Sequence, residues 1–595
     1  MSLTKNFTQG GQVTLHNLRM IRQVLSVTFG TTLLISLFFF CFKTWQDHAP
    51  YQRQITLTYL VAQLKTSLPF GDINKRTQIF VYEDGKKQKV RSVDILNDRW
   101  MKDQIGYIED MLIYNFFLSA IVFLTTFLGF MGFWVWRGKA RMKKEILSGS
   151  REASMNDVIK IMRQKNKISD IYLDKMPLLK DSETKHILLV GTIGSGKTNT
   201  FNHLLPQIRK RKQKAVIVDT TGVFVEKFYN SRTDIILNPF DARTQAWDIW
   251  RECENDIHAD ELAASLVPQA LHDPFWSDAA RTLFVETLKK LKRTENPSLK
   301  SLVDYAINQP LSEIQNFYAG TPAASLVDKA GDKTAASIRV NLATYIRCLF
   351  LQEESSSPFS IRKWIQDEKQ TGWLFLTAMP DQRETLRPLL TTQLNIAINS
   401  LMGLRPDQDR RVWFIIDEKP SLNKVEALPK ALAEIRKYGG CIVAGLQNIS
   451  QIDKLYGHEV RKTMSSLYNT KVFFRTPDSD TAQWISKTVG DHEIKESSEG
   501  ISFGAHQMRD GVSINEQQKS KAVIPYTEFM SIPDLSAYIK LPEDYPVTRI
   551  TFSYKNIENK NVAFVEKPHV VERTALAKQV NIKPHKEEMA EVCEF

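Results

Sequence analysis

The chain of 595 residues is too long for one hydrophobic core and predicts two or three globular domains beside any membrane-embedded part. Its net charge of +12 is compatible with nucleic acid or anionic lipid as a partner, but for this length it is only a weak indication of either. Five cysteines without any C-x-x-C spacing argue against a disulfide framework and against a structural metal site.

Two uncharged, apolar segments in the first quarter of the chain are long enough to cross a lipid bilayer. They are residues 24–42 and 111–136, and about 20 residues are needed to span the hydrocarbon layer. A cleaved signal peptide is the alternative for the first segment, but no small residues typical of a cleavage site follow it. A buried hairpin of a soluble domain is the alternative for the pair. We predict a membrane module over residues 1–150 with two transmembrane helices.

Basic residues flank both segments on the side away from residues 43–110, which predicts that both chain termini face the cytoplasm. The basic residues are Arg19, Arg22, Arg137, Lys139, Arg141, Lys143 and Lys144. Residues 43–110 are then predicted to lie on the opposite side of the membrane.

Residues 191–198 read GTIGSGKT, a full match to the phosphate-binding loop G-x-x-x-x-G-K-[ST]. An apolar run precedes the loop and a helical apolar spacing follows it, which is the strand-loop-helix context that such a loop requires. The glycines let backbone N–H groups point at phosphates, Lys197 adds a positive charge, and Thr198 supplies a hydroxyl for Mg²⁺. The predicted cofactors are ATP and Mg²⁺. The residues predicted to bind the nucleotide are Gly191, Thr192, Ile193, Gly194, Ser195, Gly196, Lys197, Thr198 and Asn199.

Short apolar runs alternate with helical segments on both sides of residues 247–360, which is typical of a parallel sheet covered on both faces. The runs are residues 215–218, 235–237, 373–376, 412–416, 441–444 and 472–474. Residues 247–360 themselves show helical spacing and no convincing strand. We predict an α/β nucleotide-binding domain over residues 151–246 and 361–555, with an all-helical insert domain over residues 247–360.

One predicted helix of the insert carries a cluster of basic side chains at its end. The cluster consists of Lys289, Lys290, Lys292 and Arg293. Such a cluster suits contact with nucleic-acid phosphates, and a solvated helix face is the alternative.

The apolar run at residues 412–416 ends in the pair Asp417-Glu418. Asp417 is predicted to hold Mg²⁺ through water, beside the hydroxyl of Thr198, and Glu418 to polarise the water that attacks the γ-phosphate. Many strands end in an acidic residue, so the interpretation depends on the phosphate loop found earlier in the chain. With Lys197, Glu418 is a predicted catalytic residue, and it distinguishes a hydrolase from a nucleotide sensor.

A helix predicted over residues 424–438 ends at Gly439-Gly440 and carries Arg436 in its last turn. A cation there stabilises the helix dipole, so a structural role is one interpretation of Arg436. The following strand ends at Gln447, at the edge of a parallel sheet where ligands bind. Gln447 is a further predicted catalytic residue that senses the γ-phosphate, with a purely structural glutamine as the alternative.

Two segments near the C-terminus are predicted to lack regular structure. Residues 496–521 are polar and contain Gly and Ser, which predicts a long loop. Residues 556–595 are predicted to form a C-terminal tail. Its last ten positions, residues 586–595, are acidic and end in Phe595, so this end is a candidate peptide ligand, with an unstructured tail as the alternative.

The combined pattern resembles the type IV secretion coupling proteins. It consists of the phosphate loop, IIDEKPSL at residues 415–422, the position of Arg436, GLQ at residues 445–447, two N-terminal spans and an all-helical insert. Residues 8–12 (TQGGQ) and 273–276 (DPFW) further resemble the TraD branch of F-like conjugation systems. The resemblance extends from about residue 8 to about residue 554. It implies a RecA-like, homo-hexameric ATPase of the bacterial inner membrane, related to the FtsK and HerA motors.

The resemblance also implies the substrate, the partners and one catalytic residue. The substrate is relaxase-bound single-stranded DNA, recognised without sequence preference and delivered to a type IV secretion channel, with effector proteins as a second cargo. The implied partners are the relaxase, a relaxosome accessory protein and the channel components. Arg436 is implied to be a catalytic arginine finger that reaches the nucleotide of the neighbouring subunit, and the helical insert to contact DNA and substrate protein.

Two positions depart from the family pattern, and two other functions stay open. Lys419 replaces a usually apolar residue, and Asp219 to Gly222 read DTTG where Asp-Pro-x-Gly is common. Neither departure removes a catalytic group.

The alternative functions are an FtsK/HerA-like membrane-tethered DNA translocase outside conjugation, and a substrate-docking receptor with little ATPase activity. The intact motif residues argue against the receptor, and the lack of further spans and of a visible winged-helix module argues against the chromosomal translocase.

Overall fold

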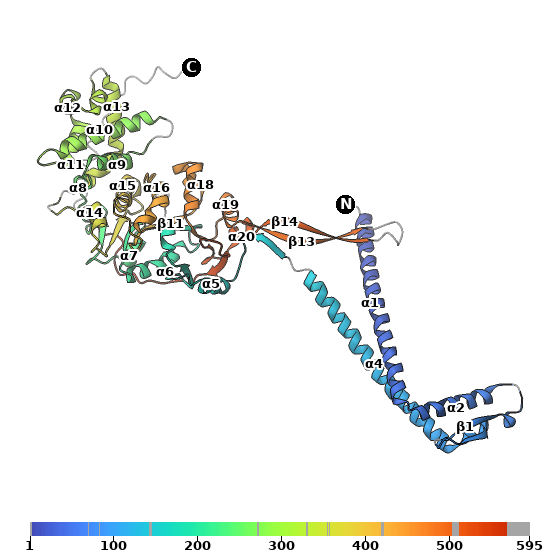
Figure 1. Cartoon of the computed structure of the whole chain (residues 1–595). Helices are drawn as coiled ribbons and strands as arrows, with labels where there is room; N and C mark the ends of the chain where they lie inside the picture. Colours follow the sequence, from blue (N-terminus) through green and yellow to red (C-terminus); the bar gives the residue numbers. More distant parts are fainter. Residues whose placement is uncertain are drawn as a thin grey trace. The chain divides into compact units, whose positions relative to one another are not determined.

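The computed structural model describes residues 3–69, 71–82, 84–141, 145–269, 273–328, 331–353, 355, 357–417, 422–502 and 511–567 (Figure 1). The chain divides into two compact units. The first unit comprises residues 1–145 and 497–515, and the second comprises residues 146–496 and 516–595.

Two long helices and a small α/β lobe form the first unit. Its elements are α1 (Leu3–Asp47), α2 (Pro50–Ser67), η1 (Ile73–Lys75), β1 (Thr77–Val81), β2 (Lys87–Arg91), α3 (Ser92–Asn97) and α4 (Arg99–Arg141). Helices α1 and α4 lie side by side: Ser36 Oγ donates to Ser119 O at 2.7 Å, and the rings of Phe29 and Phe123 meet edge to face at 5.4 Å. Strands β1 and β2 pair antiparallel.

Parts of α1 and α4 are long and apolar enough to cross a membrane. These parts are Leu18–Asp47 and Arg99–Lys139, and they include both predicted spans. Their apolar side chains are exposed: Leu34 is 67%, Phe38 74% and Phe117 63% accessible. A core helix of a soluble protein would bury such side chains, so both helices are suited to anchor the chain in lipid.

A large mixed sheet forms the centre of the second unit. Among the described residues it has nine strands, in the order β16 (Thr548–Thr551), β15 (Ser536–Lys540), β12 (Thr470–Phe473), β6 (Ile187–Val190), β11 (Gly440–Leu446), β10 (Val412–Ile416), β7 (Lys214–Asp219), β9 (Trp373–Thr377) and β8 (Ile235–Leu237). The strands from β12 to β8 are parallel to their neighbours, and β15 runs antiparallel to both β12 and β16. The predicted α/β fold class and all six predicted strands are confirmed.

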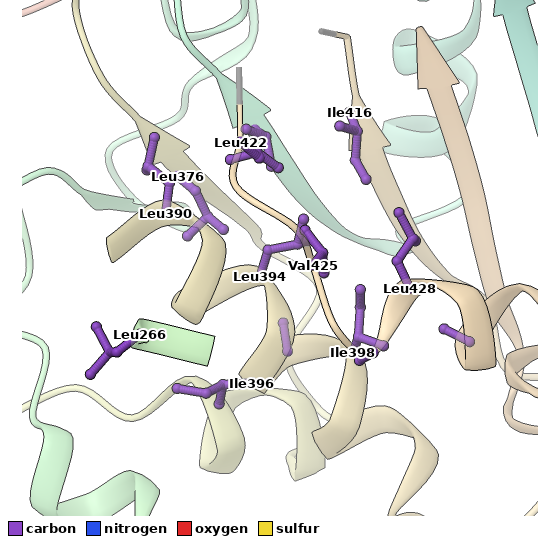
Figure 2. Close-up of a cluster of buried hydrophobic side chains, with 14 of the residues drawn as sticks. Leu266, Leu376, Leu390, Leu394, Ile396, Ile398, Ile416, Leu422, Val425 and Leu428 are labelled. Atoms are coloured by element: carbon purple, nitrogen blue, oxygen red, sulfur yellow. The ribbon is translucent and has the colours of Figure 1, made fainter. Parts of the chain in front are cut away.

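Both faces of this sheet are buried, because alternate side chains of each strand enter different cores. In β10, for example, Phe414 and Ile416 belong to one core, and Trp413 and Ile415 belong to the other. On the first face, α15 (Arg383–Met402) packs Leu390 and Leu394 toward β9 and β10 (Figure 2). Burial on both faces explains why the sequence shows continuous apolar runs rather than alternation.

Further elements occur between residues 145 and 531, outside the helical segment described below. They are β3 (Glu145–Gly149), α5 (Met155–Gln164), β4 (Ile168–Leu173), β5 (Met176–Leu179), η2 (Glu183–Lys185), α6 (Lys197–Lys210), α7 (Val223–Phe228), α14 (Ile361–Gln366), α16 (Leu428–Glu434), η8 (Ile435–Tyr438), α17 (Ser450–Tyr456), α18 (His458–Leu467), α19 (Ser479–Val489), β13 (Asp491–Ser502), β14 (Gly511–Ala522) and α20 (Tyr526–Ser531).

Between Ile249 and Leu351 the described residues form helices and connecting turns. The helices are α8 (Ile249–Glu252), α9 (Asp256–Leu266), α10 (Pro274–Lys292), α11 (Leu299–Val303), η3 (Asp304–Asn308), α12 (Leu311–Tyr318), η4 (Pro322–Val327), α13 (Asp332–Ile346) and η6 (Arg347–Leu351). The segment thus has the helical character predicted for the insert. The assignment of the insert as a separate domain stays a prediction.

Two local predictions are wrong. The predicted loop over residues 496–521 instead belongs largely to the strands β13 and β14, which pair with each other. Strand pairing uses backbone groups, so a polar sequence without a buried face can form it and leave no apolar signal. The helix predicted over residues 424–438 begins only at Leu428, with Pro429 in its first turn, a position that proline favours.

Candidate nucleotide-binding site

Most of the predicted site residues that the structure describes lie at one edge of the sheet, where the parallel strands have their carboxyl ends. In the order β6, β11, β10, β7, each strand ends at this edge in a polar or glycine-rich turn. These turns begin with Gly191, Gln447, Asp417 and Thr220, respectively. Because neighbouring parallel strands end on the same side, the phosphate loop and the acidic strand end are brought together from distant parts of the chain.

The phosphate loop connects β6 to α6 and takes backbone conformations that require glycine. Gly194 and Gly196 have φ angles of +77° and +125°. A Cβ on Gly196 would lie 2.9 Å from the ring of Phe474, and a Cβ on Gly191 would lie 2.6 Å from Phe474 Cβ. Phe474 follows β12 and is fully buried, and its side chain therefore packs directly against the glycines of the loop. The sequence pattern gave no signal of this role, since Phe474 is one of many apolar residues in predicted strands.

Hydrogen bonds hold the loop against the neighbouring strand ends. Gly191 N donates to Leu446 O at 3.0 Å, and Thr192 N donates to Arg475 O at 2.8 Å. Ser195 Oγ donates to Thr192 O at 2.7 Å, and its backbone carbonyl accepts from Leu535 N at 2.9 Å. Hydrogen bonds within the protein thus fix the conformation of the loop. Ile193 lies at its tip with 76% of its surface exposed.

Lys197 and Thr198 are the first two residues of α6, and their side chains make different contacts. Lys197 Nζ donates to the loop carbonyls of Gly191 and Thr192, at 2.6 and 2.9 Å. Thr198 Oγ1 lies 3.5 Å from Asp417 Oδ2 at the end of β10. A hydroxyl and a carboxylate at this separation are both oxygen ligands of the kind that Mg²⁺ prefers. The glycine-lined loop, the helix N-terminus and this oxygen pair fit a nucleotide with its Mg²⁺.

Gln447 and Asp417 directly follow the adjacent strands β11 and β10, whose backbones approach closely at this point. A Cβ on Gly445, two residues before Gln447, would lie 2.0 Å from Asp417 O, so only glycine allows this approach. Gln447 is half-buried at the carboxyl end of β11. Glu418, the predicted catalytic carboxylate, and Lys419 lie outside the described residues.

Asp219 at the end of β7 has a structural role at this edge. Its buried carboxylate accepts hydrogen bonds from the backbone N–H groups of Thr221, Gly222, Phe224 and Val225, and so caps α7. Burial raises the pKa of Asp219, and these four donors oppose the rise. The unusual DTTG turn therefore keeps the strand-to-helix connection without a proline.

Asn199 joins the phosphate-loop helix to a later segment that the sequence did not indicate. Its side chain donates to Ser553 O at 2.9 Å and accepts from Lys555 N at 2.8 Å. His203, one turn later in α6, also contacts Ser553 O at 2.9 Å. The Asn199 side chain is thus engaged with this later segment.

The segment after Lys555 continues across the domain, although it was predicted to start the tail. Lys560 N and Asn561 N donate to Glu226 O, and Arg243 donates to the carbonyls of Val562 and Ala563. Residues 556–567 thus pack on α7 and on the turn after β8. The acidic end at residues 586–595 lies outside the described residues.

Arg436 lies at the opposite edge of the sheet from the phosphate loop. It belongs to η8, which leads through Gly439 (φ +81°) into the amino end of β11, and its side chain is exposed. The seven residues of β11 separate this edge from Gln447. At about 3.3 Å per residue the separation is roughly 20 Å, too far for Arg436 to reach the phosphate loop of its own chain.

His186, at the same amino edge, predicts a pH dependence of stability. Its Nδ1 accepts from Ile442 N at 3.2 Å, so Nε2 carries the proton and donates to Leu432 O at 3.2 Å. Burial lowers the pKa of His186 from its ordinary 6.5 to about 4. Between these values the unfolded chain binds the proton and the folded chain does not. Stability should therefore fall by about 3 kcal/mol as the pH drops from 6.5 to 4.

The measurement is the unfolding midpoint of a fragment that spans residues 146–595, against pH. His186→Asn keeps a donor, an acceptor and tolerance for the positive φ of this position, which is 63°, but does not titrate. The variant should lose the extra acid sensitivity. Equal pH slopes for both proteins would assign the effect to other groups.

The basic cluster of α10 is largely engaged within its own unit. Lys289 Nζ lies 3.9 Å from both Asp256 and Asp260. Lys290 donates to the carbonyl of Phe317, and Lys292 to that of Cys253. These contacts favour a structural role for the lysines over phosphate contact.

Similarity to known proteins agrees with this geometry. A family profile described as the type IV secretion-system coupling protein DNA-binding domain matches residues 170–553. The coupling protein TraD of Escherichia coli K12 is 32% identical over 572 residues, which cover 93% of this chain and 78% of TraD. VirD4 of Agrobacterium fabrum is 29% identical over 147 residues, or 24% of this chain and 22% of VirD4.

Solved structures of the plasmid coupling protein TrwB share the fold. The complex of TrwB with ADP and Mg²⁺ has a TM-score of 0.64 and 30% identity, over 72% of this chain and 98% of TrwB. The complex with a non-hydrolysable ATP analogue has a TM-score of 0.63 over 71% and 98% of the two chains. A relative with the same fold thus binds an adenine nucleotide and Mg²⁺. In sequence and in fold, the chain belongs to the family of type IV secretion-system coupling proteins.

Proposed function

We propose that this protein is a membrane-anchored ATPase that recruits relaxase-bound single-stranded DNA and moves it toward a type IV secretion channel. The observation that carries the proposal is the 3.5 Å distance between Thr198 Oγ1 and Asp417 Oδ2 beside the phosphate loop, in a chain of the coupling-protein family. The exposed apolar helices α1 and α4 support an anchor in the inner membrane. The basic flanks of the spans support an orientation with both termini in the cytoplasm.

The residues of the site have separate tasks in ATP hydrolysis. When bound, ATP with Mg²⁺ would supply a γ-phosphoryl group with an electrophilic phosphorus, and the metal would partly neutralise the negative charge of its oxygens. The loop N–H groups and Lys197 would hold the phosphates, while Thr198 and Asp417 would hold the metal. Glu418 orients the attacking water and accepts its proton, and Gln447 lies where it can respond to the γ-phosphate. Arg436 acts on the site of the next subunit in a homo-hexamer.

The domain assignment follows the same division of tasks. Residues 151–246 and 361–555 form the motor, and the helical insert at residues 247–360 receives DNA and protein substrate. Residues 1–150 form the membrane module, whose lobe faces the periplasm. The relaxosome accessory protein and the channel are the remaining partners, and the last residues of the chain are a candidate contact for them.

Glu418→Gln should retain nucleotide binding and lose turnover by roughly 10²-fold or more. The amide still hydrogen-bonds to water but cannot accept its proton, and general-base catalysis contributes about 10²–10⁴-fold. ATP-analogue affinity and ATP turnover are measured on the same preparation. Glu426→Gln, eight positions later in the chain, is the control for loss of an acidic group. Loss of analogue binding by Glu418→Gln would show that Glu418 is structural.

DNA should stimulate the ATPase of the full-length protein in nanodiscs, and DNA binding should depend steeply on salt. If about six phosphates are contacted, the logarithm of affinity for a single strand should fall with the logarithm of salt with a slope of roughly −4. Fluorescence anisotropy with strands of unrelated sequence should give similar affinities. A flat salt dependence without stimulation would instead support a docking receptor that hydrolyses little ATP.

A further inference from the structure

Helix α2 of the first unit has two separate apolar faces. One face packs into the lobe: Ile55 and Ala62 are buried, and Tyr51 and Tyr59 pack beside them on the lobe core. Hydrogen bonds tie this side to the sheet, since Gln78 Nε2 of β1 donates to Thr58 O at 2.8 Å. The lobe therefore fixes which way α2 is turned.

The opposite face of α2 is apolar and exposed. It carries Leu57, Leu60, Val61 and Leu64, which are 63%, 54%, 39% and 62% accessible, and Leu68 at the helix end is 49% accessible. The spacing i, i+3, i+4, i+7 places these four side chains on one stripe of a helix. Polar residues separate the stripe from the buried face, namely Gln52, Gln54, Thr56, Thr58, Gln63 and Lys65. An exposed apolar stripe of this kind marks a surface that contacts a partner or a membrane.

The first turn of α2 is locked to the end of α1. Arg53 donates to the backbone carbonyls of Trp45 and His48 at 2.5 and 2.7 Å, and its guanidinium stacks 3.6 Å from the centre of the Trp45 ring. Trp45 is exposed at the end of the apolar part of α1, a position where tryptophan marks a membrane interface. If α1 crosses the bilayer as proposed, α2 begins at the depth of the lipid headgroups.

The direction of α2 places its stripe toward the bilayer. Figure 1 shows α2 running transverse to α1, with β1 on the side of α2 away from the long apolar stretch of α1. The buried face of α2 packs on the β1 side of the lobe. The exposed stripe is on the opposite face of α2, toward the long apolar stretches of α1 and α4. A helix lying across the span direction, with an apolar face toward the span, has the geometry of an interfacial helix.

The charge of the segment identifies the partner as lipid. Residues 48–71 contain no Asp or Glu, and Arg53 and Lys65 are its cationic residues. An acid-free helix with an apolar stripe suits anionic phospholipid headgroups and the acyl chains beneath them. We propose that α2 lies in the outer-leaflet interface of the inner membrane, with Leu57, Leu60 and Leu64 inserted among the lipids. This placement rests on the membrane insertion of α1 and α4 in the proposed function.

Depth-dependent fluorescence quenching tests the placement on the full-length protein. Single cysteines are labelled with an environment-sensitive fluorophore in a background whose other cysteines are serine, and the protein is placed in nanodiscs of phosphatidylethanolamine and phosphatidylglycerol. The sites are Leu64→Cys on the stripe, Lys87→Cys on β2 and the native Cys41 in α1. Nitroxide lipids labelled near the headgroup should quench the Leu64→Cys probe at least about twofold more than the Lys87→Cys probe.

The Cys41 probe separates the two possible failures. Quenching at Cys41 but not at Leu64→Cys overturns the interfacial placement and leaves membrane insertion intact. No quenching at Cys41 overturns the insertion of α1, and the placement of α2 with it. Disulfide crosslinking of Leu64→Cys between subunits, without quenching, would show that a second copy of the chain covers the stripe, which also overturns the proposal.

A charge variant tests the stripe by a second readout. Leu60→Glu with Leu64→Glu should reduce quenching of a probe at Leu57→Cys by at least about twofold, because carboxylates are expelled from the interface. Gln52→Glu with Gln63→Glu adds the same charge on the polar flanks and should leave this quenching in place. Equal quenching in both double variants would show that the stripe does not meet lipid.

Discussion

Arg436→Ala is expected to lower ATP turnover by about 10³-fold or more while leaving folding and ATP binding unchanged. This is the scale of loss when an arginine is withdrawn from the charge that develops on a transferring phosphoryl group. Arg436 is exposed at the amino edge of the sheet, and β11 separates it from the phosphate loop of its own chain. The proposed role therefore requires the nucleotide of a neighbouring subunit, since that of its own chain is out of reach.

Mixing experiments distinguish this role from a helix-capping role. Arg436→Ala subunits mixed with Lys197→Ala subunits should regain part of the turnover, since one chain then supplies the phosphate loop and the next supplies the arginine. Lys437→Ala removes the adjacent exposed cation of the same 3₁₀ turn and is the matched control. A helix-dipole role predicts instead a stability loss of roughly 0.3 to 1 kcal/mol with near-normal turnover. Unchanged turnover in Arg436→Ala would remove this residue from the site.

Lys197→Ala is expected to lower hydrolysis by roughly 10²- to 10³-fold, to the limit of detection, and to block DNA transfer. The ammonium of Lys197 is held at the phosphate loop by hydrogen bonds to the carbonyls of Gly191 and Thr192. The loop is also held by bonds from Gly191 and Thr192 to Leu446 and Arg475. Removing the amine should therefore leave the fold intact.

The measurements for Lys197→Ala are ATP turnover, melting temperature and membrane insertion on one preparation. Lys210→Ala, at the other end of α6 and exposed, is the matched control and should keep its turnover. Normal hydrolysis by Lys197→Ala would contradict the assignment of the nucleotide site. A fall in melting temperature comparable to a core substitution would show that the amine stabilises the loop itself.

Local features of the sequence determined several parts of this protein. The phosphate loop was predictable because its glycine positions record the positive φ angles of Gly194 and Gly196 and the lack of space for a Cβ at Gly191 and Gly196. The buried strands were predictable because burial on both faces requires unbroken apolar runs. The two long apolar helices were predictable because hydrocarbon thickness fixes the length of a span.

The tertiary structure alone decided how these parts meet. It brought Asp417 to within 3.5 Å of Thr198 across 219 positions of sequence, set Phe474 beneath the loop and fastened Asn199 to Ser553. It also placed Arg436 at the far edge of the sheet and turned one of the two apolar faces of α2 outward. A sequence pattern reports how each residue relates to its near neighbours and to burial. Contacts between distant segments depend on strand order and on backbone pairing, and neither leaves a periodic mark in the chain.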